Sequence, residues 1–208
     1  MDFITNINVW FYFIAYIVGG IPFGLILAKI FAKTNIKEAG SKSIGATNVL
    51  RVVKEKDPVL AKKLAVATII LDALKGMIVI LIAKAIGLSF ATQWAIAVLA
   101  VLGHCFSPFL KFEGGKGIAT GVGVLLIMLP VETVLALIAW AITAKVTKIS
   151  SLSSLTGLFV LLVSSFVIHP QIPHIKSHAP IILIAAIVVY KHIPNIIRLI
   201  KKEEKAAV

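Results

Sequence analysis

Long apolar runs separated by short polar segments dominate the pattern of this 208-residue chain. A helix needs about 20 apolar residues to cross a bilayer. The runs predict seven membrane-spanning helices, at about residues 9–31, 64–86, 92–110, 117–131, 132–147, 152–168 and 179–197. The fourth and fifth are short and meet around Pro130 and Glu132. We see no internal repeat and no separable soluble segment, so we expect residues 1–208 to form one all-α integral membrane domain.

Composition supports a membrane protein and argues against an ordinary soluble domain. Charged residues make up 14% of the chain and hydrophobic residues 59%, and the mean hydropathy is +1.02, whereas soluble proteins carry roughly 25% charged residues. A single cysteine, Cys105, leaves no disulfide within one chain. Residues 1–8 contain no lysine or arginine, so they lack the basic start of a signal peptide.

Basic residues are distributed unevenly between the two sides of the predicted bundle. Of the 21 lysines and arginines, 17 lie between the first two spans, after the third and fifth spans, and in the tail from Lys191. The opposite loops contain only Lys176. Cytoplasmic loops are the basic ones, so the count predicts an external N-terminus and a cytoplasmic C-terminus. The net charge of +12 then reflects lysines at the lipid surface rather than nucleic-acid binding.

Four unusual polar segments fall on the predicted cytoplasmic side. They read GSKSIGATNVLR (40–51), FEGGKGIATGVGVLL (112–126), KISSLSSL (148–155) and YKHIPNIIRLIKKEE (190–204). Because they share one side of the membrane, we expect them to form a single site.

The glycine-rich segment is not a Walker A loop, because Gly117 follows Lys116 where that motif has serine or threonine. Consecutive glycines expose backbone N–H groups, and a helix start with an adjacent lysine favours an anion. Gly114, Gly115, Lys116 and Gly117 are therefore candidate anion ligands. A glycine-rich helix contact with a snorkelling lysine is the alternative.

Two other segments carry side chains that suit phosphate. The first has the hydroxyls of Ser41 and Thr47, the amide of Asn48, and Arg51, whose guanidinium can bind phosphate in a bidentate manner. A solvated linker between helices is the alternative. In the last segment a helix would place three polar residues on one face: His192, Asn195 and Arg198. A polar belt at headgroup level is the alternative.

Other ionisable residues are less specific. Asp72 and Lys75 are three residues apart inside a span, so they can neutralise each other or act directly. We interpret His104 as a structural residue at a helix end. The external loop contains His169, His174 and His178 at a spacing that could suit a metal. No carboxylate or cysteine accompanies them, so we predict no metal site.

The chain lacks a GxSxG elbow and an HxxxxD acyltransferase pair. Covalent serine catalysis would therefore lack its usual helpers.

Three segments resemble the signatures of the bacterial acyl-phosphate:glycerol-3-phosphate acyltransferases, integral inner-membrane enzymes. These look like GSGNxGATNxxR, GHxFPxFLxFxGGKGxAT and HxxNIxRLxxGxE, and the chain has GSKSIGATNVLR, GHCFSPFLKFEGGKGIAT and HIPNIIRLIKKEE in the same order. The resemblance covers essentially the whole chain. The chain departs from the pattern at Lys42, Ser43, Ser107 and Lys202.

The resemblance implies a seven-helix fold with an external N-terminus, and transfer of a fatty acyl group from acyl phosphate to the sn-1 hydroxyl of glycerol 3-phosphate. The products would be lysophosphatidic acid and phosphate, and no cofactor is implied. Lys116, His192 and Asn195 match candidate catalytic positions. The candidate substrate-binding residues are Ser41, Thr47, Asn48, Arg51, Gly114, Gly115, Gly117, Ser151, Ser154 and Arg198.

The implied setting is the bacterial inner membrane, with membrane lipid and other enzymes of phospholipid synthesis as candidate partners and an active site facing the cytoplasm. A transporter or channel for a small anion, using the same basic segments, is the competing hypothesis.

Overall fold

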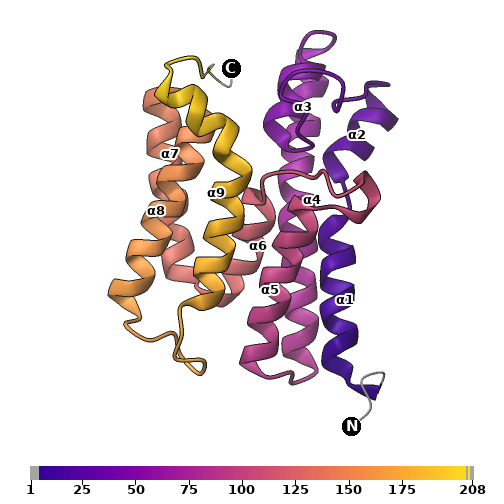
Figure 1. Cartoon of the computed structure of the whole chain (residues 1–208). Coiled ribbons are helices and arrows are strands. Elements are labelled where there is room, and N and C mark those ends of the chain that lie inside the picture. The colour runs from indigo at the N-terminus through magenta and orange to yellow at the C-terminus, as the bar shows by residue number, and fades with distance from the viewer. Residues whose placement is uncertain (1–4, 205, 207–208) are drawn as a thin grey trace.

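The computed structural model describes residues 5–204 and 206, and within them it contains helices and no strand (Figure 1). The all-α prediction is therefore confirmed. The helices are α1 (Ile7–Gly20), α2 (Phe23–Phe31), α3 (Ala46–Val53), α4 (Pro58–Ala85), α5 (Phe90–Cys105), the 3₁₀ turn η2 (Pro108–Leu110), α6 (Ile118–Met128), α7 (Pro130–Thr147), α8 (Ser150–Ile168) and α9 (Ala179–Ile200).

Among the described residues, six helical segments are long and apolar enough to cross a membrane. The first combines α1 and α2, and the others are α4, α5 extended to Leu110, α7, α8 and α9. The predicted fourth span corresponds to α6, which has only 11 residues. Much of α6 is buried within the bundle, and a backbone covered by protein need not match the bilayer thickness.

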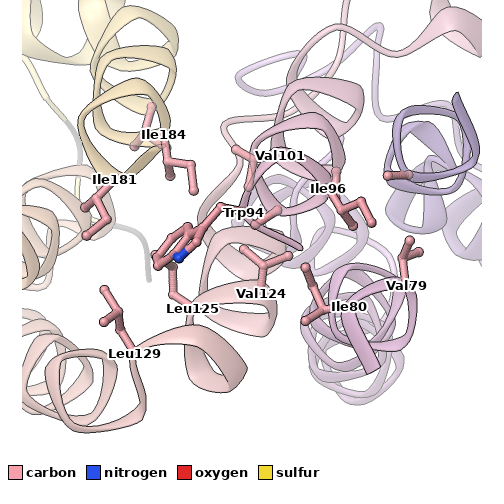
Figure 2. Close-up of a cluster of buried hydrophobic side chains, with 14 of the residues drawn as sticks. Val79, Ile80, Trp94, Ile96, Val101, Val124, Leu125, Leu129, Ile181 and Ile184 are labelled. Atoms are coloured by element: carbon pink, nitrogen blue, oxygen red, sulfur yellow. The ribbon is translucent and has the colours of Figure 1, made fainter. Parts of the chain in front are cut away.

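Helix α9 connects the two parts of the bundle (Figure 1). One part contains α1, α4, α5 and α6, and the other contains the closely packed pair α7 and α8; α9 contacts both α5 and α8. Figure 2 shows Trp94 of α5 in the buried core, with Leu125 of α6 and the α9 residues Ile181 and Ile184 nearby. A second apolar cluster, including Ile44 and residues of α2, α3 and α4, supports the segment before α3.

Glycines allow the helices to approach closely. A Cβ atom at Gly103 of α5 would lie 2.1 Å from the carbonyl oxygen of Tyr16 in α1, and one at Gly123 of α6 would lie 2.0 Å from that of Ala73 in α4. Both distances are far below van der Waals contact. Small residues at such crossings are typical of membrane helices, where close packing drives association.

The first span is broken between α1 and α2, where Pro22 lacks an N–H group. Side chains satisfy the carbonyls at this break: Ser107 Oγ donates to Gly20 O at 2.7 Å, and Lys75 Nζ donates to Ile21 O at 2.8 Å. Ser107 is a departure from the family pattern, and its hydroxyl here ties the segment after α5 to the end of α1.

Two departures from the family pattern replace glycine at left-handed positions. Lys42 has a φ angle of +57° and Lys202 one of +59°. A residue with a Cβ atom pays roughly 1–2 kcal/mol in this region. The structure therefore explains the glycines of the family pattern and shows that this chain tolerates strain at both positions.

Replacing Lys202 with glycine should relieve this strain and raise the free energy of unfolding by about 1 kcal/mol. In a protein of this size that corresponds to an increase of about 2–4 °C in Tm, measured by thermal unfolding in detergent. The neighbouring Lys201 has a φ of −78°, so Lys201→Gly is the matched control and should not stabilise. A lower Tm for Lys202→Gly would contradict the strain argument.

Candidate active site

The segments predicted to form one site lie in the upper half of the bundle as drawn in Figure 1. Thr47 at the start of α3 lies 3.1 Å from Ser150 at the start of α8, measured between their hydroxyl oxygens. The segment after α9 folds back onto α8, where Ser151 donates to Glu204 at 2.7 Å. Lys116 lies within electrostatic reach of Glu204 and Arg51.

Asn48 organises the segment before α3. Its buried side-chain amide donates to the carbonyl oxygens of Ile36 and Ser43, each at 2.8 Å, and its Oδ1 accepts from the backbone N–H of Ser41 at 2.8 Å. These bonds occupy both N–H groups of the amide. Asn48 therefore shapes the segment that carries Ser41, while Ser41 itself is exposed.

The glycine-rich loop binds the end of α5, which corrects one expectation. Gly114 N–H donates to Cys105 O at 3.1 Å and Gly115 N–H donates to His104 O at 2.9 Å. These two N–H groups are therefore not free to bind an anion, contrary to the prediction that Gly114 and Gly115 are anion ligands. Their glycines serve close approach instead, because a Cβ atom at either position would lie 2.1 Å from an atom of His104.

Lys116 and the start of α6 remain as the cationic part of the loop. Gly117, with φ +82°, precedes the first turn of α6, and no side chain caps that turn. The first N–H groups of a helix lack intrahelical partners and favour an anion. Burial lowers the pKa of Lys116 to about 8; Glu204 opposes this shift, and the positive charges of Arg198 and Arg51 add to it.

Glu204 lies among three predicted site residues, and sequence reasoning missed it. Its Oε1 accepts from Ser151 Oγ at 2.7 Å and from Asn195 Nδ2 at 2.6 Å, and its Oε2 accepts from Arg198 Nε at 2.5 Å. Burial alone would raise the pKa of this carboxyl, but the hydrogen bonds, led by that of Arg198, outweigh it and lower the pKa. The available signal was the final Glu of the third signature.

His192 is buried on the inner face of α9. Its Nδ1 lies 2.8 Å from the carbonyl oxygen of Val188, and a carbonyl only accepts, so Nδ1 carries the proton. In the neutral ring Nε2 then has a lone pair that can accept a hydrogen bond. Lys116 and Glu204 both lie within electrostatic reach of the ring, which places His192 beside the cationic loop.

The structure distinguishes the two candidate serines of α8. Ser151 contacts Glu204, whereas Ser154 Oγ donates to the carbonyl oxygen of Ser150 in its own helix at 2.9 Å. Ser151 therefore joins Asn195 and Arg198, while the hydrogen bond of Ser154 stays within α8.

The three histidines of the opposite loop have separate partners. His174 stacks on Phe90 and His178 on Phe166, while His169 Nδ1 lies 2.5 Å from Glu132 Oε1. Within the described residues no group of three or more histidine, cysteine, aspartate or glutamate side chains has metal-binding geometry.

Apolar membrane-length helices and a cluster of cationic side chains at one end of the bundle define an integral membrane protein with a site suited to anions. The chain belongs to the glycerol-3-phosphate acyltransferase family, whose sequence profile matches residues 9–202. The family named by the resemblance is thus confirmed.

Relatives match along nearly the whole chain. A glycerol-3-phosphate acyltransferase of a Nitratiruptor species is 66% identical over 204 residues, 98% of each chain. That of Sulfurimonas denitrificans is 60% identical over 208 residues, 100% of each chain. A crystal structure of PlsY (YgiH), an integral membrane glycerol 3-phosphate acyltransferase, in its glycerol 3-phosphate form, superposes with a TM-score of 0.86 at 32% identity, covering 97% of this chain and 96% of that one. Its lysophosphatidic acid form gives a TM-score of 0.83 at 32% identity, with 97% and 95% covered.

The pKa of Lys116 predicts how activity depends on pH. Below about pH 8 the amine is protonated, and above it the cation is lost, so kcat/KM for a phosphate-bearing substrate should fall as pH rises through about 8. The pH profile of kcat/KM reports groups of the free enzyme. Lys116→Arg, whose guanidinium stays protonated, should remove this fall, and Lys116→Ala should lose about 100-fold or more at pH 7. A folded Lys116→Ala variant with near-normal turnover would favour the snorkelling alternative.

Glu204 should affect the pH at which kcat/KM falls. Its negative charge raises the pKa of Lys116, so Glu204→Gln should move the fall in kcat/KM to lower pH. The adjacent Glu203 is exposed, and Glu203→Gln is the matched control, expected to leave the limb in place. An identical profile for both variants would contradict the placement of Glu204 beside Lys116.

Proposed function

We propose that this protein transfers a fatty acyl group from acyl phosphate to the sn-1 hydroxyl of glycerol 3-phosphate and releases lysophosphatidic acid and phosphate. The observation that carries the proposal is a group of cationic residues with one carboxylate: Lys116 lies within electrostatic reach of Glu204, Arg198 and Arg51, and Arg198 pairs with Glu204. Such a site suits phosphate, which both substrates carry. The names of the relatives and the glycerol 3-phosphate and lysophosphatidic acid forms of PlsY support this substrate and product.

The cations and the α6 N-terminus neutralise substrate phosphate in this scheme. Lys116, Arg51 and Arg198 supply positive charge, and Ser41 and Thr47 supply hydroxyl donors from the segment that Asn48 organises. The glycines at 114, 115 and 117 allow the loop to lie against α5. Ser151 orients the acyl phosphate, with Ser154 one turn further along α8.

His192 and Asn195 orient the attacking hydroxyl. The lone pair on His192 Nε2 accepts a hydrogen bond from the sn-1 hydroxyl, and Asn195 acts from the next turn of α9. As the hydroxyl oxygen bonds to the acyl carbon, the bond from that carbon to the phosphate oxygen breaks, and phosphate leaves with the electron pair. The hydroxyl proton passes late in the reaction to an oxygen of the phosphate of glycerol 3-phosphate itself. Acyl phosphate has a good leaving group, so positioning and charge stabilisation suffice without an enzymic nucleophile.

The polar segments also favour a membrane arrangement. We propose that residues 1–208 act as one domain with seven crossing helices, α6 being the short one, in the bacterial inner membrane. Helix α1 begins at the lower end of the bundle and α9 ends at the upper end (Figure 1). With the basic loops in the cytoplasm, the site faces the cytoplasm, where other enzymes of phospholipid synthesis are candidate partners.

A small-anion transporter is the competing function. Transporter sites usually lie near the bilayer midplane, whereas Ser151, Arg198 and Glu204 lie at helix ends. This placement favours the enzyme.

The direct test is an assay of purified protein with palmitoyl phosphate and radiolabelled glycerol 3-phosphate, followed for labelled lysophosphatidic acid. We expect turnover in the wild type and a large loss in Lys116→Ala. Without glycerol 3-phosphate, no stoichiometric burst of phosphate and no acyl-serine adduct should form. Absence of labelled product from folded wild-type protein would refute the acyltransferase, and anion uptake into vesicles would then support the transporter.

Substitutions of His192 test its orienting role. Glutamine keeps a hydrogen-bond donor and acceptor of similar reach, so His192→Gln should retain at least about tenfold more kcat/KM than His192→Ala, as expected when general acid–base catalysis is not the main contribution. Steady-state kinetics at pH 7 measures the difference. Equal inactivity of both variants, with both folded, would indicate that His192 is an obligatory base.

Fused reporters test the topology. A reporter attached after the C-terminal residue should be cytoplasmic, and one inserted near Ile172 should be external, because the basic loops determine orientation. Labelling with a membrane-impermeant reagent in intact cells reads out both positions. Finding the two reporters on the same side would contradict the seven-span arrangement.

A further inference from the structure

Three ionisable side chains form a buried cluster between α4 and α5. Lys75 Nζ lies 2.7 Å from Asp72 Oδ1 and 3.0 Å from His104 Nδ1. No more than 4% of any of these three side chains is exposed. Ionisable residues inside a membrane span are costly and usually functional, yet the substrate contacts proposed above use none of them.

The cluster joins two irregular parts of the backbone. Lys75 Nζ donates to Ile21 O at the break between α1 and α2. Because an ammonium group only donates, His104 Nδ1 is the acceptor and the ring proton resides on Nε2. The carbonyl of the same histidine accepts the N–H of Gly115.

The ring of His104 also fixes how close the glycine-rich loop can come. A Cβ atom at Gly115 would lie 2.1 Å from His104 Nε2, so the ring and the loop backbone are in direct contact. Lys116 is the next residue. A rotation of the imidazole toward the loop would therefore collide with Gly115, the residue that precedes the lysine.

Simple neutralisation does not account for this arrangement. A buried ion pair that only fills space can often be replaced by apolar residues without loss of stability. Here the lysine also bonds the imidazole and a helix-break carbonyl, so it fixes the ring relative to α1 and α4.

We propose that Asp72, Lys75 and His104 are positioning residues for the acyl transfer, holding the glycine-rich loop against the end of α5 so that Lys116 meets the substrate phosphate. The proposal rests on the proposed function. Asp72 holds the Lys75 amine in place, Lys75 holds Nδ1 of His104, and His104 supports Gly115 through its carbonyl and its ring.

A steric exchange tests the contact between His104 and the loop. Gly115→Ala should push the loop from the ring and lower kcat/KM for glycerol 3-phosphate by about 100-fold, a loss that a displacement near 1 Å can cause. In a His104→Ala background, which removes the ring, the same substitution should cost less than about tenfold.

Gly114→Ala is the matched control for this exchange. A Cβ atom at Gly114 would meet the carbonyl oxygen of His104 at 2.1 Å, and His104→Ala does not remove that atom. Gly114→Ala should therefore cost the same in both backgrounds. Equal costs of Gly115→Ala in both backgrounds would overturn the proposal.

A charge-neutral replacement tests the ion pair. Asp72→Asn combined with Lys75→Gln leaves the net charge unchanged, and it should lower kcat/KM by about tenfold or more while Tm stays within a few degrees. The groups facing Lys116 are Arg51 of α3, Arg198 and His192 of α9, and Glu204. A displaced loop moves Lys116 toward water and relieves the burial that is the largest cause of its lowered pKa, so the fall in kcat/KM should move to higher pH.

A folded double variant with wild-type kcat/KM and an unshifted pH limb would overturn the role of the ion pair. If that variant does not fold, the exchange at Gly115 and His104 decides the proposal alone. Failure of the proposed function is distinct, because the wild type itself would then form no lysophosphatidic acid.

Discussion

Positive charge gathered on a partly buried surface is the constraint on which the site depends. Burial and, after it, repulsion by the positive charges of Arg198 and Arg51 lower the pKa of the Lys116 amine to about 8. Glu204 offsets the repulsion when it accepts hydrogen bonds from Arg198, Asn195 and Ser151. A site in this condition favours an additional anion, because a phosphate group neutralises cations that already lie close together.

Backbone hydrogen bonding explains how the glycine-rich loop carries its cation. Backbone groups that are buried against other helices must find hydrogen-bond partners within the protein. The glycine-rich loop meets this requirement by donating from Gly114 and Gly115 to the last carbonyls of α5. The same hydrogen bonds hold the backbone next to Lys116, so they satisfy the loop backbone and also position the lysine. The polar groups of Ser107 and Lys75 perform the equivalent task at the break in the first span.

The sequence predicted the helices well because long apolar runs in a membrane protein leave few alternatives. It predicted a short fourth span, which is the 11-residue α6. It did not predict the break at Pro22, since this break depends on tertiary partners: the carbonyls at the end of α1 find donors on α4 and after α5. Periodicity along one segment carries no information about such partners.

In the site, too, the features carried by one segment were predicted and those that depend on tertiary partners were not. The signatures identified Lys116, Asn195 and Arg198, and the structure gathers them at one end of the bundle. That the N–H groups of Gly114 and Gly115 bind α5 carbonyls, and not an anion, was not predictable. The sequence shows that an N–H group exists but not which group accepts its hydrogen bond. Glu204 was missed for a related reason: its partners include Ser151, 53 residues earlier in the chain. Nothing in the described contacts explains Ser43 in place of the family's asparagine.

The central claim is that the cationic cluster binds the phosphate of glycerol 3-phosphate, and titration calorimetry of the purified wild type without acyl phosphate tests it most directly. We predict saturable binding of glycerol 3-phosphate that weakens as salt concentration rises, since charge supplies the attraction, and no saturable binding of glycerol under the same conditions. Equal binding of the two compounds, or binding of glycerol 3-phosphate that is indifferent to salt, would contradict it.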